Sequence, residues 1–492
     1  MQEEKDTLLR DQTDRSLQNW HDQEKAALRL LQLAGDLRFD RNTELVLFRS
    51  GVYDCRPSEL LQRHLLSLNY SDKAIEVQDT LRLAEAIARQ TELNPAKIDL
   101  GKIAIEWVQE GADYPDVDAF IGFKLRNMIE ESLPGKTAKD VVLYGFGRIG
   151  RLVARRIIDQ TGAGDQLRLK AIVLRPKMAD RFEEVTKRAS LLATDTVHGN
   201  FAGTVQVSED GSEMIINGNR VQVIFAKSPD AIDYTSYGIE NALLIDNTGV
   251  WRDREALSIH LRPGIDQVML TAPAKDIPNI VHGVNQKDLN LAEDKIFCAA
   301  SCTTNAISPV LSAIEGKYGI EKGHVETIHA YTSDQNLLDN FHKKPRRGRG
   351  AATNMVLTST GAAKAVAKVI PVLKGKLTGN AVRVPTPNVS LAILNLTLKS
   401  ATNREALDAY LRQSCLEGDF VEQIHYSTST EYVSSSAVGM TTTSVLDAPS
   451  TIVSADGQNI TLYLWYDNEY GYTCQVVRLA KYAAEVRRAV YY

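Results

Sequence analysis

Hydrophobic and polar positions recur with different periods along the chain, and the changes of period divide the sequence into parts. In the first part, apolar side chains recur at helical spacing in three stretches. These stretches are 28–34, 77–88 and 120–129. The run 45–48 is the one short segment in this part that could form a strand. We therefore predict a mostly α-helical N-terminal extension over residues 1–137, which ends in a hinge at 133–136.

A strand–helix–strand pattern begins directly after the extension. An apolar run at 140–144 leads into a glycine turn, residues 152–158 have helical periodicity, and 167–173 returns as a second strand. Two later apolar runs continue a parallel sheet. These runs are 242–245 and 267–270. The pattern predicts an α/β domain with a parallel sheet over residues 138–302.

Longer segments with alternating apolar and polar residues follow residue 302. They are 324–329, 389–396 and 459–465. Alternation over this length is typical of an antiparallel sheet with one buried face. We predict an α+β domain with a mixed or antiparallel sheet over 303–467. In the last segment, 468–492, the apolar residues between Val476 and Val490 have helical spacing, and we predict a C-terminal helix.

Composition and charge exclude several classes of protein. The 492 residues are 43% hydrophobic and 24% charged with a formal net charge of −5, which is an ordinary globular profile and gives no reason to expect a nucleic-acid partner. The five cysteines are scattered without a CxxC pair, so we expect neither a disulfide framework nor a metal site. The acidic N-terminus does not resemble a secretory signal, and there is no 18-residue apolar stretch that could span a membrane. We expect a cytoplasmic protein.

The segment Ser301-Cys302-Thr303-Thr304-Asn305 is the most informative in the chain. It lies between a strand-like run and a segment that can begin a helix. A cysteine in the first turn of a helix lies beside unpaired N–H groups and the positive end of the helix dipole, which favour the thiolate. A single buried cysteine is more often a small hydrophobic residue, but the flanking hydroxyl and amide groups favour a nucleophile here.

These residues also carry a resemblance. The sequence SCTTNA resembles the active-site motif of phosphorylating glyceraldehyde-3-phosphate dehydrogenases, and the similarity runs from about residue 138 to residue 492. Four further stretches agree with that family in order and spacing. They are GFGRIGR at 145–151, HAYT at 329–332, TSTGAAKA at 358–365 and WYDNEYGY at 465–472. The resemblance implies that the C-terminal helix packs back on the Rossmann domain and that the protein is a homotetramer.

A dinucleotide site is predicted at the glycine turn. Gly145, Gly147 and Gly150 form the GxGxxG pattern between a strand and a helix, where they allow a tight turn, approach of a pyrophosphate and close helix–strand packing. Phe146, Arg148 and Ile149 lie between them. The resemblance adds further residues around the cofactor cleft, with Asn468 orienting the nicotinamide amide. These are Thr248, Gly249, Thr271 and Asn468.

The second strand departs from the usual NAD pattern. It ends in Leu174-Arg175-Pro176, where an acid usually holds the ribose hydroxyls, and Arg175 could instead contact a 2′-phosphate. Asn340 and Phe341 also stand where NAD-preferring members of the family usually have Leu-Pro, and Tyr144 replaces the usual Asn before the first glycine. We favour use of NADP, alone or alongside NAD. In the alternative, Arg175 points into solvent and another segment supplies the carboxylate.

The catalytic residues follow from the resemblance. Cys302 would be the nucleophile, and His329 would act as the base that raises the thiolate fraction and later removes a proton. Two anion sites would hold the phosphate of the substrate and inorganic phosphate, although a basic run such as 346–349 is usually solvated surface. The residues that match these sites are Ser301, Thr303, Thr332, Arg347, Thr360, Gly361 and Arg383.

The resemblance therefore implies a phosphorylating aldehyde dehydrogenase of glycolysis and gluconeogenesis. Its substrates would be glyceraldehyde 3-phosphate, inorganic phosphate and NAD(P)+, and its product 1,3-bisphosphoglycerate would form through a thioester on Cys302. Erythrose-4-phosphate dehydrogenase is the nearest enzymatic alternative, because it resembles this family and uses the same thioester. A second alternative, from another class, is an interaction or regulatory protein that acts through the extension.

Overall fold

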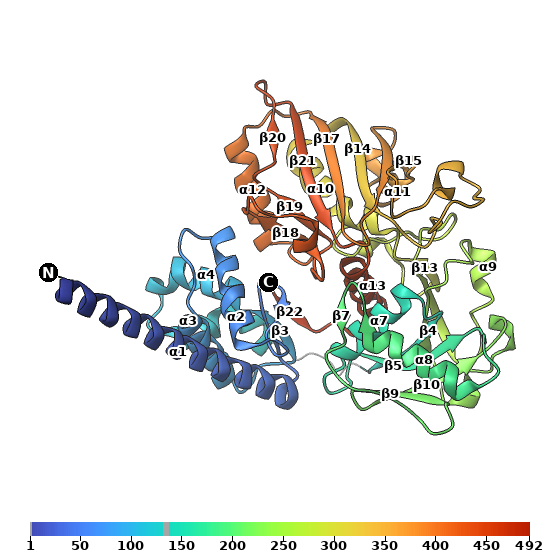
Figure 1. The fold of residues 1–492 in the computed structure, drawn as a ribbon, viewed down its shortest axis with the longest axis horizontal. Coiled ribbons are helices and arrows are strands. Elements are labelled where there is room, and N and C mark those ends of the chain that lie inside the picture. Colours follow the sequence, from blue (N-terminus) through green and yellow to red (C-terminus); the bar gives the residue numbers. More distant parts are fainter. Residues whose placement is uncertain (1, 131–136) are drawn as a thin grey trace. The chain divides into compact units, whose positions relative to one another are not determined.

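The computed structural model describes residues 2–130 and 137–492, which form two compact units (Figure 1). The first unit, called the extension below, comprises Met1–Gly135 together with Arg488–Tyr492. The second, called the catalytic unit, comprises Lys136–Arg487. The predicted hinge at 133–136 lies outside the described residues. The predicted fold class is confirmed, with a Rossmann domain, an α+β domain and a helical extension.

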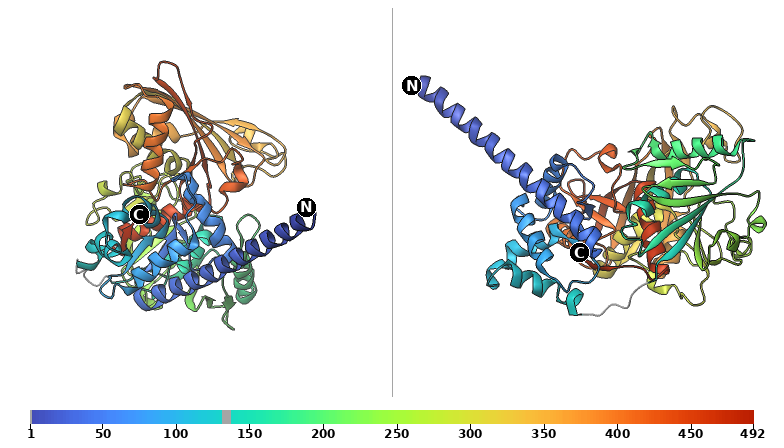
Figure 2. Two further views of the ribbon diagram at one scale, coloured as in Figure 1. Left: turned by 90° about the vertical axis from the view of Figure 1, so that its left-hand side faces the viewer. Right: turned by 90° about the horizontal axis from the view of Figure 1, so that it is seen from below.

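The helices of the extension contain all three stretches of helical periodicity, although the third, 120–129, is divided between two helices at Leu125. Their bounds are α1 (Gln2–Arg41), α2 (Pro57–His64), α3 (Val77–Arg89), α4 (Leu100–Glu110), α5 (Val117–Lys124) and α6 (Arg126–Glu130). The C-terminal half of α1 packs against α2 and α3 through buried residues such as Leu30 and Leu37. Residues 10–22 of the same helix are exposed, as the long N-terminal end of α1 in Figure 2 illustrates.

The extension also contains a four-stranded sheet in the order β2-β1-β3-β22. The strands are β1 (Glu44–Leu47), β2 (Ser50–Gly51), β3 (Ala96–Asp99) and β22 (Ala489–Tyr491). Only β1 was predicted. The four residues of β3 include just two apolar side chains, so its sequence carries no strand signal of its own. Asp99 holds this strand in place: its buried carboxylate accepts hydrogen bonds from the main-chain N–H groups of Phe48, Arg49 and Gly101.

The predicted C-terminal helix is shorter than its apolar spacing indicated. Helix α13 (Tyr470–Ala483) ends before Glu485, which has a left-handed backbone with φ of 56°. That conformation is unfavourable for a residue with a side chain and does not continue a right-handed helix. The prediction of a helix through Val490 was therefore wrong, because β22 occupies residues 489–491 and pairs in parallel with β3.

The first sheet of the catalytic unit has the order β13-β12-β11-β4-β5-β10-β9-β8. Its strands are β4 (Lys139–Tyr144), β5 (Leu167–Leu174), β8 (Val205–Val207), β9 (Glu213–Ile216), β10 (Asn219–Phe225), β11 (Ala242–Asp246), β12 (Ile265–Leu270) and β13 (Ile296–Cys298). The six strands from β13 to β10 are parallel, so their carboxyl ends meet at one edge, where a dinucleotide fold binds its ligand.

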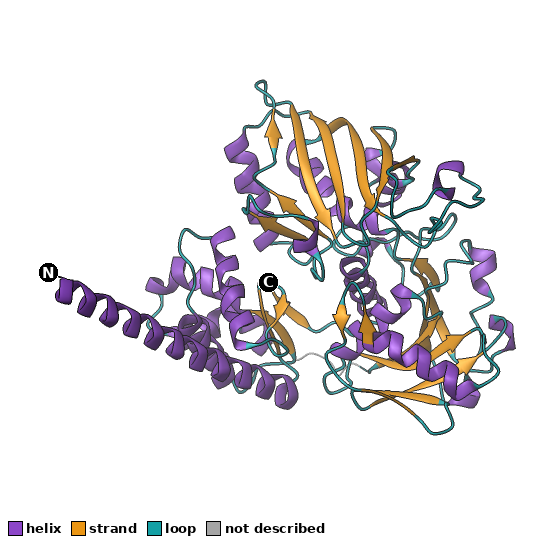
Figure 3. Ribbon diagram, viewed as in Figure 1, coloured by secondary structure: helices purple, strands orange, loops and turns teal. Residues whose placement is uncertain are grey.

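Helices cover both faces of this sheet (Figure 3). They are α7 (Arg148–Asp159), α8 (Arg181–Ala193), α9 (Arg254–Ser258) and the already defined α13. Apolar residues of α13, among them Val476 and Leu479, share one core cluster with Val153 and Ile157 of α7. This packing brings the last helix of the catalytic unit onto the dinucleotide fold. The two-stranded pair β6 (Thr194–Asp195) and β7 (Gly199–Asn200) follows α8.

The second sheet is mixed and has the order β15-β16-β14-β17-β21-β19-β18, with β20 beside β21. Its strands are β14 (Ile320–Ala330), β15 (Val356–Thr358), β16 (Leu377–Val384), β17 (Ser390–Leu398), β18 (Ile424–Ser427), β19 (Ser444–Asp447), β20 (Ile452–Val453) and β21 (Asn459–Tyr466). Buried positions alternate along β17, as its sequence predicted. The helices of this region are α10 (Cys302–Tyr318), α11 (Ala362–Val369) and α12 (Arg404–Leu416).

Two features are absent from the described residues. None of the helices in the described ranges is long and apolar enough to cross a membrane. Within the same ranges, no group of three or more His, Cys, Asp or Glu side chains could hold a metal ion. All five cysteines are free.

We predict that strand β22 stabilises the extension. The Tyr491 hydroxyl donates a 2.6 Å hydrogen bond to Glu106 Oε2, and Lys102 Nζ donates to the main-chain oxygen of Tyr492. Removal of residues 488–492 takes away these contacts and one edge of the sheet. Hydrogen exchange of the full chain should then show faster exchange in β3 and α4, with the catalytic unit unchanged. Tyr491→Phe should give a smaller effect, because it removes one bond to a charged group worth about 1.5–3 kcal/mol. Equal protection of β3 in the full and shortened chains would contradict the prediction.

Candidate active site

Cys302 lies at a sharp turn between a strand and a helix. Strand β13 ends at Cys298, Ala300 adopts a left-handed backbone with φ of 52°, and α10 begins at Cys302. Ser301 caps the helix, because its Oγ accepts a 3.1 Å hydrogen bond from the main-chain N–H of Thr304. The turn therefore presents Cys302 as the first residue of the helix, as the sequence predicted.

The side chain of Asn305 fixes the turn from behind. Its Nδ2 donates to the carbonyl oxygens of Ala299 at 2.7 Å and Ser301 at 3.0 Å. Asn305 is buried, so these bonds are not exchanged with water. Helix α10 then continues through Pro309, although a proline inside a helix removes one main-chain hydrogen bond.

His329 is the partner of Cys302. It lies next to the end of β14, is 6% exposed, and places Nε2 at 3.6 Å from Cys302 Sγ. The buried hydroxyl of Tyr466 ties together the two elements that carry this pair. It lies 3.0 Å from Thr303 Oγ1 on α10 and 2.7 Å from Thr327 Oγ1 on β14.

Arg383 lies on the other side of His329. Strands β14 and β16 pair in parallel with His329 opposite Arg383, and Arg383 Nη1 lies 2.8 Å from His329 Nδ1 and 2.7 Å from the carbonyl oxygen of Ala330. A guanidinium group can only donate, so in this arrangement Nδ1 accepts and the imidazole proton is on Nε2, facing Cys302. The other tautomer would place the proton between Nδ1 and the Ala330 carbonyl oxygen, which are 2.7 Å apart, and leave Nε2 able to accept a proton.

Burial keeps the Cys302–His329 pair neutral. It raises the pKa of the Cys302 thiol above its ordinary value, although the positive charge of Arg383 and hydrogen bonds from Thr303 oppose this effect. Burial and the charge of Arg383 together lower the pKa of His329 to about 3. We expected the start of the helix to favour the thiolate. In the free chain, desolvation outweighs that effect, so a thiol faces a neutral imidazole.

The predicted anion-binding residues are only partly brought together. Arg347 lies close enough to Arg383 for its charge to lower the pKa of that guanidinium, after the larger effect of burial. The side chain of Arg347 also donates to Thr358 Oγ1 at 3.1 Å and pairs with Asp334. Thr332 follows the end of β14 by two residues, and its hydroxyl accepts from the Asp334 N–H at 3.4 Å. Two arginines thus lie beside the Cys302–His329 pair.

Thr360 and Gly361 lie between β15 and α11. The Thr360 hydroxyl accepts from the N–H of Ala362 at 3.1 Å, and Gly361 is the N-cap residue of α11. Among the residues that the structure describes, no hydrogen bond joins either residue to Cys302, His329 or Arg383. Their part in the predicted phosphate site stays a prediction.

The glycine turn has the geometry of a dinucleotide cradle. Gly145 has φ of 88°, and a Cβ there would lie 2.7 Å from Thr248 Cγ2. A Cβ on Gly150 would lie 2.4 Å from the carbonyl oxygen of Gly145, so helix α7 can approach the strand only with glycine at this position. Gly147 has no neighbour within 4 Å of its Cβ position, which leaves the start of α7 open. Phe146 is buried and Ile149 packs against the same core, so their side chains support the turn.

The later strand ends of the sheet are held by a buried carboxylate that the sequence did not reveal. Asp246 Oδ1 accepts from both the N–H and the hydroxyl of Thr248 at 2.6 Å, and its carbonyl oxygen accepts from the N–H of Thr271 at 3.0 Å. Asp246 Oδ2 lies 3.4 Å from His260 Nε2, and both side chains are fully buried. Gly249 follows with φ of 60°. Asp246 thus fixes the loop that contains Thr248, Gly249 and Thr271.

The end of β5 carries exposed cations and a carboxylate that is already bonded. Arg175 and Lys177 are exposed. The buried carboxylate of Glu184 accepts from the main-chain N–H groups of Lys177 at 2.8 Å and Met178 at 2.9 Å and pairs with Arg188. Glu184 therefore orders the loop after β5 and is directed toward protein groups.

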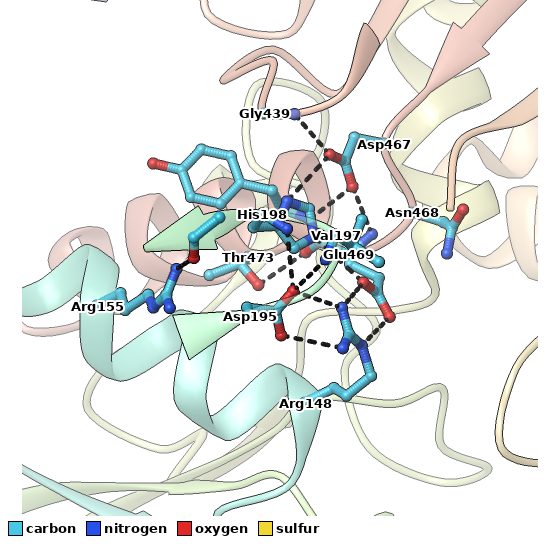
Figure 4. A network of polar contacts seen from close by, with 12 residues as sticks. Arg148, Arg155, Asp195, Val197, His198, Gly439, Asp467, Asn468, Glu469 and Thr473 are labelled. Carbon is cyan, nitrogen blue, oxygen red and sulfur yellow. Dashed lines mark hydrogen bonds and ion pairs between the residues drawn. The ribbon is translucent and has the colours of Figure 1, made fainter. Parts of the chain in front are cut away.

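Asn468 lies at the end of β21 within a polar network (Figure 4). Its Oδ1 accepts a 2.9 Å hydrogen bond from Ser390 Oγ. The adjacent Glu469 forms a two-point ion pair with Arg148 of the glycine turn, at 2.6 Å and 2.5 Å. The sequence did not indicate this pairing, because the two residues are 321 positions apart and each lies in a motif with its own explanation.

Two family models match the catalytic unit. The NAD-binding domain model of glyceraldehyde 3-phosphate dehydrogenase matches residues 139–254, and the C-terminal domain model of the same enzyme matches residues 301–468. The chain is 38% identical to a glyceraldehyde-3-phosphate dehydrogenase of Zymomonas mobilis over 350 residues, which are 71% of this chain and 99% of that protein. The chain is likewise 38% identical to glyceraldehyde-3-phosphate dehydrogenase 1 of Bacillus subtilis over 350 residues, which are 71% of this chain and 99% of that protein.

One relative is similar beyond the catalytic unit. A glyceraldehyde-3-phosphate dehydrogenase-like protein of Pseudomonas aeruginosa is 49% identical over 462 residues, which are 93% of this chain and 98% of that protein. The alignment is too long to fit within the catalytic unit, so the likeness includes much of the extension.

We predict that alkylation of Cys302 by iodoacetamide accelerates steadily from pH 6 to pH 9. The thiol has a raised pKa, so the thiolate fraction increases about tenfold per pH unit while the pH stays below that pKa. Arg383→Gln should slow the reaction at every pH in this range, because loss of the positive charge raises the pKa further. Arg349→Gln is a matched control, since this exposed arginine pairs with Asp339. A rate that is constant across the range would show that Cys302 is already a thiolate at pH 6.

Proposed function

The chain belongs to the glyceraldehyde-3-phosphate dehydrogenase family of oxidoreductases, and we propose that it is a phosphorylating enzyme acting on glyceraldehyde 3-phosphate. The products would be 1,3-bisphosphoglycerate and NAD(P)H. The observation that carries the proposal is the contact of 3.6 Å between Cys302 Sγ and His329 Nε2, with Arg383 against the far side of the imidazole. A nucleophile, a base and a cation for an anionic substrate therefore lie within one site.

Cys302 and His329 perform the covalent chemistry in this proposal. In the tautomer that carries its proton on Nδ1, facing the Ala330 carbonyl oxygen, Nε2 of His329 can accept, and it takes the proton of Cys302 as Sγ attacks the aldehyde carbon. The low pKa of His329 keeps the imidazole neutral at pH 7. The imidazolium would return this proton to the carbonyl oxygen, which becomes the hydroxyl of the covalent adduct. His329, neutral again, would then remove that proton as hydride leaves the carbon. Attack by inorganic phosphate on the resulting thioester releases the acyl phosphate and restores the thiol.

The dinucleotide would supply a hydride acceptor, and the residues present fit such a ligand. Gly145 and Gly150 permit a backbone approach that a Cβ would block, and the start of α7 is open beside Gly147. A helix N-terminus of this kind favours a pyrophosphate. Asn468 lies in the turn between β21 and α13, where its amide group would orient the nicotinamide carboxamide.

Two cations support the binding of phosphorylated substrates. Arg383 is half-buried beside His329, and Arg347 lies near it. The fixed geometry of a guanidinium group suits two phosphate oxygens at once. Arg347 is already paired with Asp334, so an anion that binds there competes with a carboxylate. The helix start at Gly361 and the hydroxyl of Thr360 would complete the second phosphate site.

We propose that the enzyme accepts NADP as well as NAD. Strand β5 ends at Leu174 without an acid, and Arg175 is exposed directly after it. The carboxylate that lies close to this loop, on Glu184, is held by two main-chain N–H groups and Arg188. It is thus engaged elsewhere and does not stand in for the missing acid, which favours a 2′-phosphate on Arg175 over a free ribose hydroxyl.

Two further expectations stay predictions. The proposed homotetramer is supported by exposed apolar side chains in the loop after β14, where Leu337, Leu338 and Phe341 are each at least 77% exposed. An apolar surface of this kind is typical of a subunit contact. The cytoplasmic location is a prediction from the sequence.

The central prediction concerns the two catalytic residues. Cys302→Ser should reduce phosphate-dependent oxidation of glyceraldehyde 3-phosphate to below a few per cent, because a hydroxyl group is a far weaker nucleophile. His329→Asn should lower kcat by about 10²–10⁴-fold through loss of the base. Steady-state assays with glyceraldehyde 3-phosphate and erythrose 4-phosphate in parallel measure both effects and identify the preferred aldehyde. Near-normal kcat in both variants would exclude the thioester route.

A separate prediction concerns the choice of cofactor. Leu174→Asp should shift kcat/KM toward NAD, since a carboxylate there attracts ribose hydroxyls and repels a 2′-phosphate. Arg175→Ala should raise the KM for NADP more than the KM for NAD, because a charge-assisted contact worth about 1.5–3 kcal/mol is lost. The measurement is the NADP/NAD ratio of kcat/KM in the parent and both variants. A parent that prefers NAD by a hundredfold, with no change of ratio in either variant, would refute NADP use.

A further inference from the structure

An ion pair between two side chains joins the two turns that would hold opposite ends of the dinucleotide. Arg148 belongs to the glycine turn at the start of α7, and Glu469 directly follows Asn468 (Figure 4). We infer that Arg148 and Glu469 are positioning residues, which hold Asn468 where it fixes the orientation of the nicotinamide ring. This inference rests on the proposed function, because it assumes hydride transfer to a nicotinamide at this site.

The guanidinium of Arg148 uses four hydrogen bonds to two carboxylates. It contacts Glu469 through Nε and Nη2 at 2.6 Å and 2.5 Å, and Asp195 through Nη1 and Nη2 at 3.0 Å and 3.2 Å. Such paired contacts restrict both the distance and the plane of the groups that they join. Lysine cannot reproduce them, since its single ammonium group has no planar fork.

The partners of Arg148 are themselves fixed. Asp195 accepts from the main-chain N–H groups of Val197 and His198, both at 2.9 Å, and His198 Nε2 lies 3.1 Å from Glu469 Oε2. Burial opposes ionisation of Asp195, but these N–H groups and Arg148 outweigh it and lower the pKa to about 2. The pKa of Glu469 is also lowered, since His198 and Arg148 outweigh its burial. Both carboxylates are therefore charged at neutral pH, and Glu469 has two partners on the dinucleotide fold.

Hydrogen bonds within the α+β region also support the segment around Asn468. Asp467 Oδ1 accepts from the N–H groups of Glu469 and Tyr470, and its Oδ2 accepts from the N–H of Gly439. These bonds shape the turn within the α+β region. Ser390 Oγ contacts the Asn468 amide at 2.9 Å from the same region. The Arg148–Glu469 pair is a direct side-chain link between this turn and the glycine turn, beside the His198 contact and the packing of α13 on α7. It therefore helps to set the position of Asn468 relative to the pyrophosphate end of the site.

The consequence lies in the face of the ring that receives hydride. In the proposed reaction, the C–H bond of the carbon attached to Cys302 Sγ breaks, and its electron pair forms the new C–H bond at C4 of the nicotinamide. That carbon is oxidised to the thioester level, the cofactor is reduced, and the hydroxyl proton passes to His329. A ring that is held by its carboxamide presents one face only. A ring with a loosened carboxamide contact can turn over and receive hydride on the other face.

The experiment measures this stereochemistry in the full chain. Glyceraldehyde 3-phosphate carrying deuterium on the aldehyde carbon is oxidised, and proton NMR of the reduced cofactor shows which C4 position holds the deuterium. The parent should label one position only. Arg148→Lys and Glu469→Gln should each place a measurable fraction, several per cent or more, at the other position. Both should also raise the KM for the cofactor by about tenfold, as expected for loss of a charge-assisted pair.

Arg155→Lys is the matched control. Arg155 lies on the same helix, in the same region of Figure 4, and donates to the carbonyl oxygens of Leu192 at 2.8 Å and Gly199 at 3.1 Å. Replacing the planar guanidinium of Arg155 by an ammonium group removes hydrogen bonds and lowers stability, but the partners of these bonds lie outside the turn that contains Asn468. The control should therefore label a single position even if its melting temperature falls. Alkylation of Cys302 without cofactor should proceed at the parent rate in all three variants.

The outcomes distinguish failure of the positioning role from failure of the proposed function. Mixed labelling in the Arg148 and Glu469 variants, with single-position labelling in the Arg155 variant, supports the positioning role. Single-position labelling in every variant overturns it, whatever happens to stability, and so does mixed labelling in the Arg155 variant. A parent protein that does not oxidise the aldehyde at all would instead overturn the proposed function.

Discussion

The catalytic unit depends on the turn that carries Cys302 from β13 to the start of α10. Ala300 accepts an unfavourable left-handed conformation there, and the bonds of Ser301 and Asn305 hold it. The turn places Sγ within 3.6 Å of His329, a residue of the other sheet. The nucleophile thus comes from the edge of the Rossmann fold and the base from the α+β fold. Their meeting requires both folds to pack with little freedom.

Burial is the second constraint on the site. It makes the Cys302 thiol harder to ionise, and it also keeps the His329 imidazole neutral. It raises the pKa of Cys302 and lowers that of His329, so the free chain holds a neutral pair. The charge of Arg383 opposes the effect of burial on Cys302, because it favours the thiolate. The same charge acts together with burial on His329, because both suppress its protonation. An environment of this kind keeps the thiol protected from oxidation and leaves its activation to the reacting complex.

Local motifs account for what the sequence could predict. The glycine turn, the position of Cys302 at a helix start and the alternation of β17 are signals within a few residues, and the structure has all three. The partners of Arg148 could not be predicted, because Asp195 and Glu469 lie 47 and 321 positions away. The register that sets Arg383 against His329 is likewise a property of strand pairing. In the extension, β3 is too short to show a period, and β22 is a strand only because β3 pairs with it.

Detection of the covalent intermediate tests the proposed mechanism without relying on any variant. The full chain is mixed with glyceraldehyde 3-phosphate and NAD+ or NADP+ in the absence of phosphate, quenched in acid, digested and analysed by mass spectrometry. The proposed mechanism predicts an acyl adduct on the peptide that contains Cys302, formed together with one equivalent of reduced cofactor and lost on addition of phosphate. Formation of reduced cofactor without any adduct on Cys302, or an adduct on another residue, would contradict it.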